Sequence, residues 1–309
     1  METAFIKSAA DGRTLKTYNW RVNDAKGAVQ IIHGICEHAG RYDYVAKSLN
    51  KAGYAVFSHD HRSFGGSVDA GNAEFSADGH FADKDGWEKA VLDILQVQKQ
   101  NSVAGQKTFL LAHSMGSFLG QSLMQRNDLP YKAVALSGTR GPVKIKDKIA
   151  AALAKFERWR HGLRNFSPLA DKLMEQEFNG PFKPNRTPYD WICTDPAVVD
   201  AYIADPHAGG KFSTQLACDL SGALIDIYNS GFTNTDRSLP VYLLSGERDP
   251  VGMMGKSVKE LHSYLKAKGF ADLEMNLYPD LRHEVLNEPQ KDKVISDLIS
   301  WLDVQAAAE

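Results

Sequence analysis

Residues 108–126 read TFLLAHSMGSFLGQSLMQR: a short apolar run, a serine between small residues, and a helical run. This order of strand, sharp turn, serine and helix is typical of a nucleophile elbow, in which a strained serine stands at the carboxyl end of a strand. The turn needs small neighbours, and Ala112 and Gly116 supply them. The alternative is a serine that only caps a helix, but the flanking strand and helix favour Ser114 as a nucleophile.

Similar apolar runs recur on both sides of this stretch, at residues 28–34, 54–60, 133–138, 241–247 and 273–279. They lack a clean period of two, which is typical of strands buried on both faces of a mostly parallel sheet. A hairpin is expected at 4–22. Helical stretches are expected at 44–51, 84–100, 117–126, 255–268 and 290–304. The alternation predicts an α/β fold with a doubly wound sheet flanked by helices.

The interval from residue 139 to residue 237 breaks the alternation. It holds an amphipathic run at 144–166, a loop rich in proline and aromatic residues at 178–191, and a helical run at 216–230. A connection of this length with helices of its own predicts an inserted helical cap. Residues 1–138 and 238–309 then form the core domain.

Composition narrows the class of protein. The 309 residues carry a net charge of −2, with 43% hydrophobic and 24% charged residues. No basic excess points to nucleic acid. No run has the length of a signal peptide or a membrane span, so we expect a cytoplasmic protein. Cys36, Cys193 and Cys218 lack CxxC spacing, which indicates buried reduced thiols rather than disulfides or a zinc site.

A serine nucleophile needs a base, and the base needs an acid to orient it. His283 follows the last apolar run and precedes the last helix. Asp249 follows the run at 241–247, at the end of a strand where such sheets place function. Glu247 is the nearest competing carboxylate. A loop histidine and a turn aspartate are common alone, but the chain order serine, aspartate, histidine favours a catalytic triad.

Two backbone amides are expected to form an oxyanion hole. One is the N–H of Met115, directly after the nucleophile, and the other is the N–H of Ile35 in the loop after the run at 28–34. Gly34 allows the backbone to approach a substrate closely. His113 precedes the nucleophile and, with His33 and His38 at other strand ends, is a candidate for lining the site.

Six segments resemble the monoacylglycerol lipase and lysophospholipase-like branch of the α/β-hydrolases, especially its bacterial members. They are HGICEHAGRY at 33–42, DHRSFGGS at 60–67, AHSMG at 112–116, WICTDPAVVDAYIADP at 191–206, SGERDPVG at 245–252 and RHEVLNE at 282–288. The resemblance implies the α/β-hydrolase fold with eight strands, the second antiparallel. It also implies a triad of Ser114, Asp249 and His283, and no metal or organic cofactor.

The chain departs from the family pattern at three small-residue positions. Ser63 stands where the D-x-R-G-x-G-x-S segment usually has glycine, Ala112 begins the elbow, and Asp280 stands where glycine usually precedes the catalytic histidine by three residues. None of the three departures removes a predicted catalytic group. We expect these three departures to change the shape of loops near the site.

The expected substrate is a small lipid ester held under the cap. Apolar residues of the cap are candidates for an acyl channel: Leu153, Phe156, Trp159, Phe166, Leu169, Leu173 and Phe178. Packing of the cap onto the core is the alternative role for each. The basic side chains of 155–164 suggest contact with a lipid surface, or simply a solvated helix face. The sequence does not indicate an oligomeric state.

The sequence thus predicts a serine carboxylic-ester hydrolase acting on monoacylglycerols, lysophospholipids or related esters through an acyl-enzyme on Ser114. A thioesterase, an amidase and an acyltransferase remain alternatives, because one triad serves all of these reactions. A non-catalytic binding protein is the alternative from another class, although such proteins usually have a broken triad.

Overall fold

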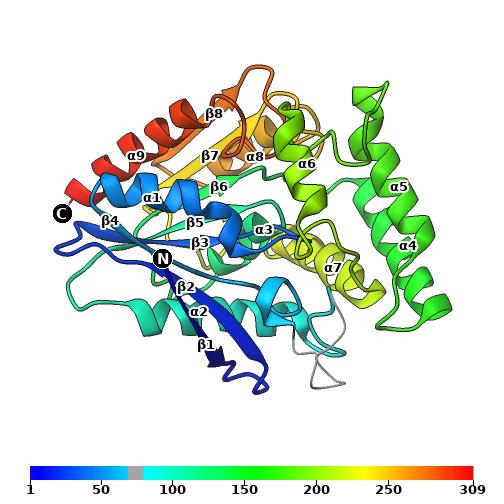
Figure 1. Ribbon diagram of the computed structural model, residues 1–309, viewed down its shortest axis with the longest axis horizontal. Helices are drawn as coiled ribbons and strands as arrows, with labels where there is room; N and C mark the ends of the chain where they lie inside the picture. The colour runs from blue at the N-terminus through cyan, green and yellow to red at the C-terminus, as the bar shows by residue number, and fades with distance from the viewer. Residues whose placement is uncertain (69–78, 309) are drawn as a thin grey trace.

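The computed structural model describes residues 1–68 and 79–308, and within them the strands form one sheet in the order β1-β2-β4-β3-β5-β6-β7-β8 (Figure 1). Strand β2 is antiparallel to both of its neighbours, and the other pairings are parallel. The predicted eight-stranded, mostly parallel sheet is confirmed. The strands are β1 Glu2–Lys7, β2 Thr14–Trp20, β3 Gly27–Ile32, β4 Tyr54–His59, β5 Thr108–His113, β6 Val134–Ser137, β7 Val241–Gly246 and β8 Leu273–Tyr278.

Helices cover both faces of this sheet. Helices α1 Asp43–Lys51 and α9 Lys291–Ala307 pack on one face, and α2 Gly86–Asn101, α3 Met115–Leu123 and α8 Lys256–Ala267 pack on the other. In β5, Phe109 and Leu111 pack in the hydrophobic cluster with α1 and α9. Leu110 and Ala112 pack in the cluster on the opposite face, with α2, α3 and α8. Because both faces are apolar, the strand sequences show no period of two.

The edge strand β8 is an exception to the predicted burial on both faces. Its residues alternate, with Glu274 and Asn276 exposed. Within the described residues, strand β8 pairs only with β7 and lies at the end of the sheet, so side chains on one of its faces reach solvent. The expectation drawn from the run at 273–279 is therefore wrong for this strand.

Four helices lie between β6 and β7: α4 Ile145–His161, α5 Pro168–Asn179, α6 Pro196–Ala204 and α7 Thr214–Ser230. We call residues 139–237 the insertion. Ser167 and Asp195 accept hydrogen bonds from the first turns of α5 and α6, and a proline at the start of each helix fixes the backbone there. Helix α7 packs against α4 and also contacts α2 and α3, which joins the insertion to the core.

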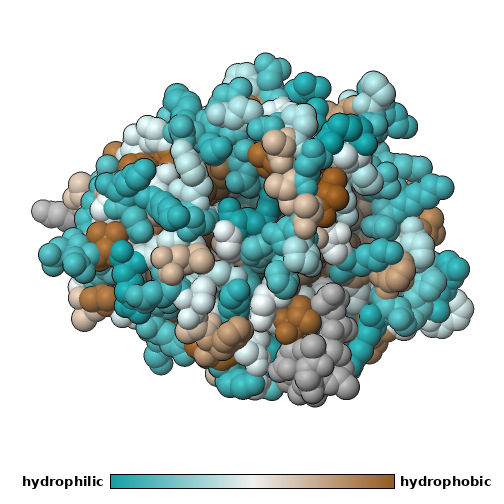
Figure 2. Space-filling model, in the orientation of Figure 1, coloured by the Kyte–Doolittle hydropathy of each residue, from teal (hydrophilic) through white to brown (hydrophobic). Residues whose placement is uncertain are grey.

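Helices α4 and α5 lie at one end of the molecule, on the right in Figure 1. The face in Figure 2 is mostly hydrophilic, with apolar residues gathered over α6 and smaller groups at the edge formed by α4 and α5. In the described ranges, no helix is both long and apolar enough to cross a membrane. Three short 3₁₀ turns complete the elements of the described residues: η1 Ala39–Tyr42, η2 Gly65–Ser67 and η3 Gly180–Phe182.

Candidate active site

Ser114 lies at the turn between β5 and α3 with a positive φ of 53° and a ψ of −124°. Such a backbone is strained for a residue with a side chain and holds Ser114 at the end of the strand. Gly116 makes the turn feasible, because a Cβ there would lie 2.5 Å from the carbonyl oxygens of both Ile32 and His33. The predicted turn of strand, serine and helix is thus present, with its small neighbour in place.

His283 and Asp249 form a buried pair. Nδ1 of His283 lies 3.0 Å from each carboxylate oxygen of Asp249. The carboxylate also accepts hydrogen bonds from the backbone N–H of Val251 at 2.9 Å and from the hydroxyl of Ser245 at 3.2 Å. These contacts hold Asp249 in position, and they favour the His283 tautomer that carries its proton on Nδ1 and leaves Nε2 as an acceptor.

The imidazole of His283 has close neighbours besides Asp249. Its ring centroid lies 4.7 Å from that of His113 and 5.0 Å from that of Trp191. Gly138 has φ 56°, and a Cβ there would lie 2.8 Å from Cε1 of His283. A larger residue at the end of β6 would therefore displace the imidazole.

The pKa values of the neighbouring His283 and His113 are shifted in opposite directions. Burial lowers the pKa of His283, but the charge and hydrogen bond of Asp249 outweigh burial and raise the pKa above its usual value. Burial, together with repulsion from His283, lowers the pKa of His113 to about 3. His113 thus stays neutral near pH 7, and a proton in this pair resides on His283.

Residues from the core and the insertion enclose one cavity of about 920 Å³, part of it open to solvent. Its lining includes seven of the residues predicted for the site: Gly34, Ile35, His113, Ser114, Met115, Phe178 and His283. It also includes residues to which the sequence assigned no role, among them Glu37, Phe118, Met174, Trp191, Tyr202 and Leu220. Asp249 lies behind His283, fully buried.

The acyl channel proposed from the insertion's apolar residues needs a correction. Of the seven candidates, only Phe178 lines this cavity. Trp159 is 79% exposed, and Phe156, Phe166, Leu169 and Leu173 are also exposed. These five side chains lie on exposed parts of α4, of α5 and of the turn between them, whereas the buried residues of α4 include the small Ala151 and Ala154.

The loop after β3 comes close to the nucleophile. A Cβ on Gly34 would lie 3.0 Å from Cβ of Ser114, so this close approach requires glycine. The N–H of Gly34 donates to Oε1 of Glu37 at 2.5 Å. Within residues 1–68 and 79–308, the backbone N–H groups of Ile35 and Met115 have no hydrogen-bond acceptor. Two donors beside Ser114 are therefore available to a ligand.

A buried network of charged side chains holds the loop after β3 in place. Arg41 contacts Glu37 at 2.6 Å and binds both carboxylate oxygens of Glu284 at 2.7 Å. Burial raises the pKa of Glu284, but Arg41 outweighs it and lowers the pKa. The network joins the loop after β3 to the loop that carries His283. Across the described ranges, no three His, Cys, Asp or Glu side chains are grouped to hold a metal ion.

Of the other candidate histidines at strand ends, neither lines the cavity. His33 accepts the backbone N–H of His61 on Nε2 at 2.8 Å and contacts the Gly34 carbonyl through Nδ1. His38 contacts a carboxylate oxygen of Asp205 at 2.8 Å. Both histidines fix loops around the site instead of facing it.

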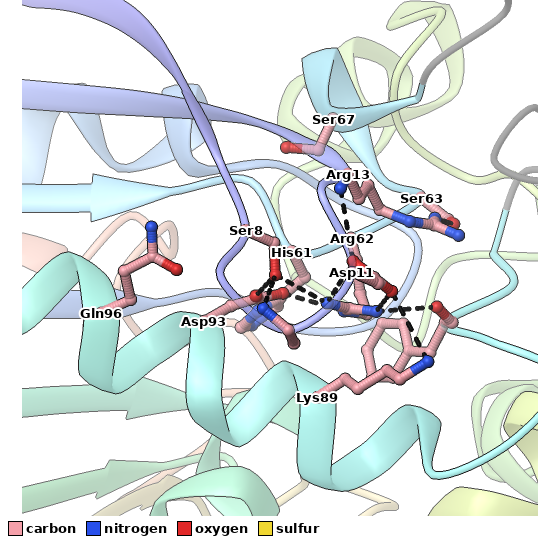
Figure 3. Close-up of polar contacts among 12 residues, drawn as sticks. Ser8, Asp11, Arg13, His61, Arg62, Ser63, Ser67, Lys89, Asp93 and Gln96 are labelled. Atoms are coloured by element: carbon pink, nitrogen blue, oxygen red, sulfur yellow. Dashed lines mark hydrogen bonds and ion pairs between the residues drawn. The ribbon is translucent and has the colours of Figure 1, made fainter. Parts of the chain in front are cut away.

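The segment at 60–67 anchors a second polar network around Arg62 (Figure 3). Figure 3 shows Ser8, Asp11 and Asp93 directed toward its guanidinium, which contacts the carboxylates of Asp93 and Asp11, both at 2.8 Å. Ser63, at a position where glycine is usual, has φ 64°, and its hydroxyl contacts Arg13 and the His80 carbonyl. Polar contacts thus compensate for a left-handed conformation that glycine adopts without cost.

Asp280, the other substitution of a usual glycine, also has a left-handed backbone, with φ 62°. Aspartate tolerates this conformation better than most residues with a side chain. Both substitutions therefore keep the loop shape that glycine would give. The departures seen in the sequence do not displace the residues of the candidate site.

The sheet order, the serine turn and the buried histidine–aspartate pair define the class of the protein, the α/β-hydrolase fold. A family model described as serine aminopeptidase, S33, matches residues 23–290, and the chain belongs to this family. The predicted serine hydrolase with this fold is confirmed.

Individual relatives agree with that class. The chain is 28% identical over 285 residues to the monoacylglycerol lipase of Mycolicibacterium smegmatis, covering 90% of this chain and 89% of that one. A thermostable carboxyl esterase from Bacillus coagulans, solved in complex with glycerol, superposes with a TM-score of 0.87 at 21% identity, covering 99% of both chains. A monoglyceride lipase from Saccharomyces cerevisiae gives a TM-score of 0.76 at 20% identity, covering 99% of this chain and 96% of that one.

Proposed function

We propose that the protein hydrolyses carboxylic esters of small lipids through an acyl-enzyme on Ser114. One observation carries the proposal: Ser114 and His283 line the same cavity, and His283 is bonded through Nδ1 to the buried carboxylate of Asp249. This arrangement supplies a nucleophile, a base and an acid that orients the base.

In the first half of the reaction, Oγ of Ser114 attacks the ester carbonyl carbon while its proton passes to Nε2 of His283. Asp249 stabilises the imidazolium that forms. The N–H groups of Ile35 and Met115 donate to the carbonyl oxygen as it gains negative charge. The bond to the alcohol oxygen then breaks, and His283 returns the proton to that oxygen.

In the second half, water replaces the alcohol. His283 takes a proton from the water molecule while the oxygen of that water attacks the acyl carbon. The bond to Oγ breaks, Ser114 recovers its proton from His283, and the fatty acid leaves. The raised pKa of His283 keeps it basic enough for both proton transfers.

The cavity favours an apolar acyl chain on a small polar alcohol. Met174, Phe178 and Trp191 of the insertion line it together with Phe118 and Leu220. The relatives named as monoacylglycerol or monoglyceride lipases support glycerol as the alcohol. We propose monoacylglycerols first, then lysophospholipids and simple esters. Gly34, His113 and Phe178 are the proposed substrate contacts.

In this proposal, residues 139–237 act as a lid, and the outer surface of that lid rests on a lipid surface. Ile145, Ile149 and Trp159 of α4 are strongly exposed, at 78%, 64% and 79%. The exposed Lys146, Lys148, Lys155 and Arg160 stand among them. Apolar side chains interspersed with cations are typical of helices that bind anionic lipid interfaces. Sedimentation with anionic phosphatidylglycerol vesicles tests this, and no co-sedimentation at low salt would refute it.

The main experiment combines labelling with a substrate panel. A fluorophosphonate probe should modify Ser114, as read by peptide mass spectrometry, and the His283→Ala protein should take up no label. Monoacylglycerols of graded chain length, a lysophospholipid, an acyl-thioester and an aminoacyl anilide then separate the ester reaction from its alternatives. Faster cleavage of the anilide would favour the amidase alternative, which the family description also raises. Modification of another residue would refute Ser114 as the nucleophile.

A further inference from the structure

Trp191 belongs to the insertion, yet its indole contacts the imidazole of His283, with ring centroids 5.0 Å apart and planes inclined by 38°. Its position is well defined. The backbone N–H of Trp191 donates to the side-chain oxygen of the buried Asn179 at 3.1 Å, and its ring centroid lies 5.0 Å from that of Phe178. The insertion thus places an aromatic ring directly against the proposed base.

The chain on either side of Trp191 is bonded to the loop that carries His283. The carbonyl of Ile192 accepts the N–H of Glu284 at 2.7 Å. The Arg282 guanidinium donates to the carbonyls of Asp190 and Cys193. We call residues 190–194 the strap, because their backbone follows this loop and is bonded to the residues on both sides of His283.

A second set of bonds closes the same connection. The N–H of Thr194 donates to the fully buried carboxylate of Glu288 at 3.0 Å, and its hydroxyl contacts the same group. Glu288 also accepts the N–H of Arg282 at 2.8 Å. One buried carboxylate therefore binds both the strap and the loop of His283, so their relative position is fixed by short charge-assisted hydrogen bonds.

We infer that Trp191 is a positioning residue for His283, and that through the strap the insertion forms part of the support of the base. The inference rests on the proposed function. The Trp191 ring packs against the imidazole and so limits its rotation, and an indole attracts the imidazolium that forms during the reaction. Loss of the ring should therefore slow the proton transfers of His283 more than it weakens substrate binding.

The experiment compares Trp191→Ala, Trp191→Phe and Phe5→Ala. The last variant is the control, since it removes an exposed aromatic side chain of the edge strand β1, outside both the cavity and the insertion. Two rates are measured on folded protein of verified Tm: the inactivation rate with a small fluorophosphonate, which has no acyl chain to bind, and kcat for a short soluble ester.

We expect Trp191→Ala to lose roughly 10- to 30-fold in both rates, as the removal of up to about 2 kcal/mol predicts. KM for the short ester should change less than threefold. Trp191→Phe should recover most of the loss, and Phe5→Ala should match the unmodified chain. The midpoint of the acid limb of kcat/KM should shift in Trp191→Ala and return in Trp191→Phe.

Rates for Trp191→Ala within twofold of the unmodified chain would overturn the inference, as would an equal loss in Phe5→Ala or a change in KM alone. Failure of the proposed function would look different. The unmodified chain would then take no phosphonate on Ser114, and no comparison among the variants would be needed to see it.

Discussion

The core and the insertion differ in what they bury. Every residue of β3, β5, β6 and β7 is buried, whereas Asn179 is the one buried residue of helix α5. In the described chain, most of the exposed large apolar side chains belong to the insertion, and most of the buried charged and histidine side chains belong to the core. The core buries polar side chains, and the insertion exposes apolar side chains to solvent.

This difference predicts where substitutions act. A buried polar group is held by specific partners, so its loss leaves those partners unsatisfied. An exposed apolar side chain contributes little to folding, so its loss matters only when the surface that it faces is present. The following predictions test that division, and the largest effects are expected in the core.

The largest effect is expected at the serine of the core. Ser114→Ala should lower kcat by at least about a thousandfold, because no nucleophile remains to form the acyl-enzyme. Steady-state hydrolysis of a soluble ester measures it, with circular dichroism as the control for folding. Activity within a few-fold of the unmodified chain would assign the nucleophile to another residue.

The next effect concerns stability. Arg62→Met should lower the free energy of unfolding by about 3–5 kcal/mol, because the carboxylate of Asp93 is left buried without its cation. The matched variant is Arg186→Met in the insertion, whose partner Asp200 is 58% exposed, and it should cost less than about 1 kcal/mol. Urea unfolding measures both, and equal losses would contradict the proposed division.

A smaller effect is expected in the pH profile. The pKa of His283 is raised above its usual 6.5, and only neutral imidazole accepts the proton of Ser114. Activity should therefore fall as the pH drops below a midpoint that lies above 6.5. Asp249→Asn should move the midpoint of its residual activity to lower pH, since Asp249 raises this pKa. A midpoint below pH 6 in the unmodified chain would refute the assignment.

The smallest effect is expected on the outer surface of the insertion. Trp159→Ser should change the free energy of unfolding by no more than about 0.5 kcal/mol. Hydrolysis of a soluble ester should be unchanged, while binding to anionic vesicles should weaken. Co-sedimentation and soluble-ester assays on the same preparation measure both quantities. A loss of soluble activity without a loss of vesicle binding would show that this residue supports the core.

The sequence predicts the core better than the insertion, for physical reasons. The buried strands were located to within one or two residues, because burial on both faces produces continuous apolar runs. The starts of α5 and α6 also left a signal in Ser167–Pro168 and Asp195–Pro196, pairs that cap helices, but short amphipathic helices have weaker patterns. The run at 273–279 does not predict the exposed side chains of β8, because an edge position is a property of the sheet and not of the strand.

In the candidate site, too, the residues of the core can be predicted from the sequence better than those of the insertion. Ser114, Asp249 and His283 follow strands in a recognisable order, so their positions carry a sequence signal. The contact between Trp191 and His283 joins segments about ninety residues apart, and no local pattern encodes such a pairing. The sequence does not show which face of α4 meets the cavity, because an amphipathic pattern distinguishes the two faces of a helix without placing either one.

The bonds between the strap and the loop of His283 also bear on how such a protein can diversify. The insertion begins after β6 and ends before β7, and these strands are neighbours in the sheet. The chain connectivity alone would therefore allow the insertion of one relative to replace that of another. Thr194 and Glu288 recognise each other across that boundary. A chimera would therefore have to inherit residues 190–194 and 282–288 from one parent, so evolution of the insertion is tied to a short segment near the carboxyl end of the chain.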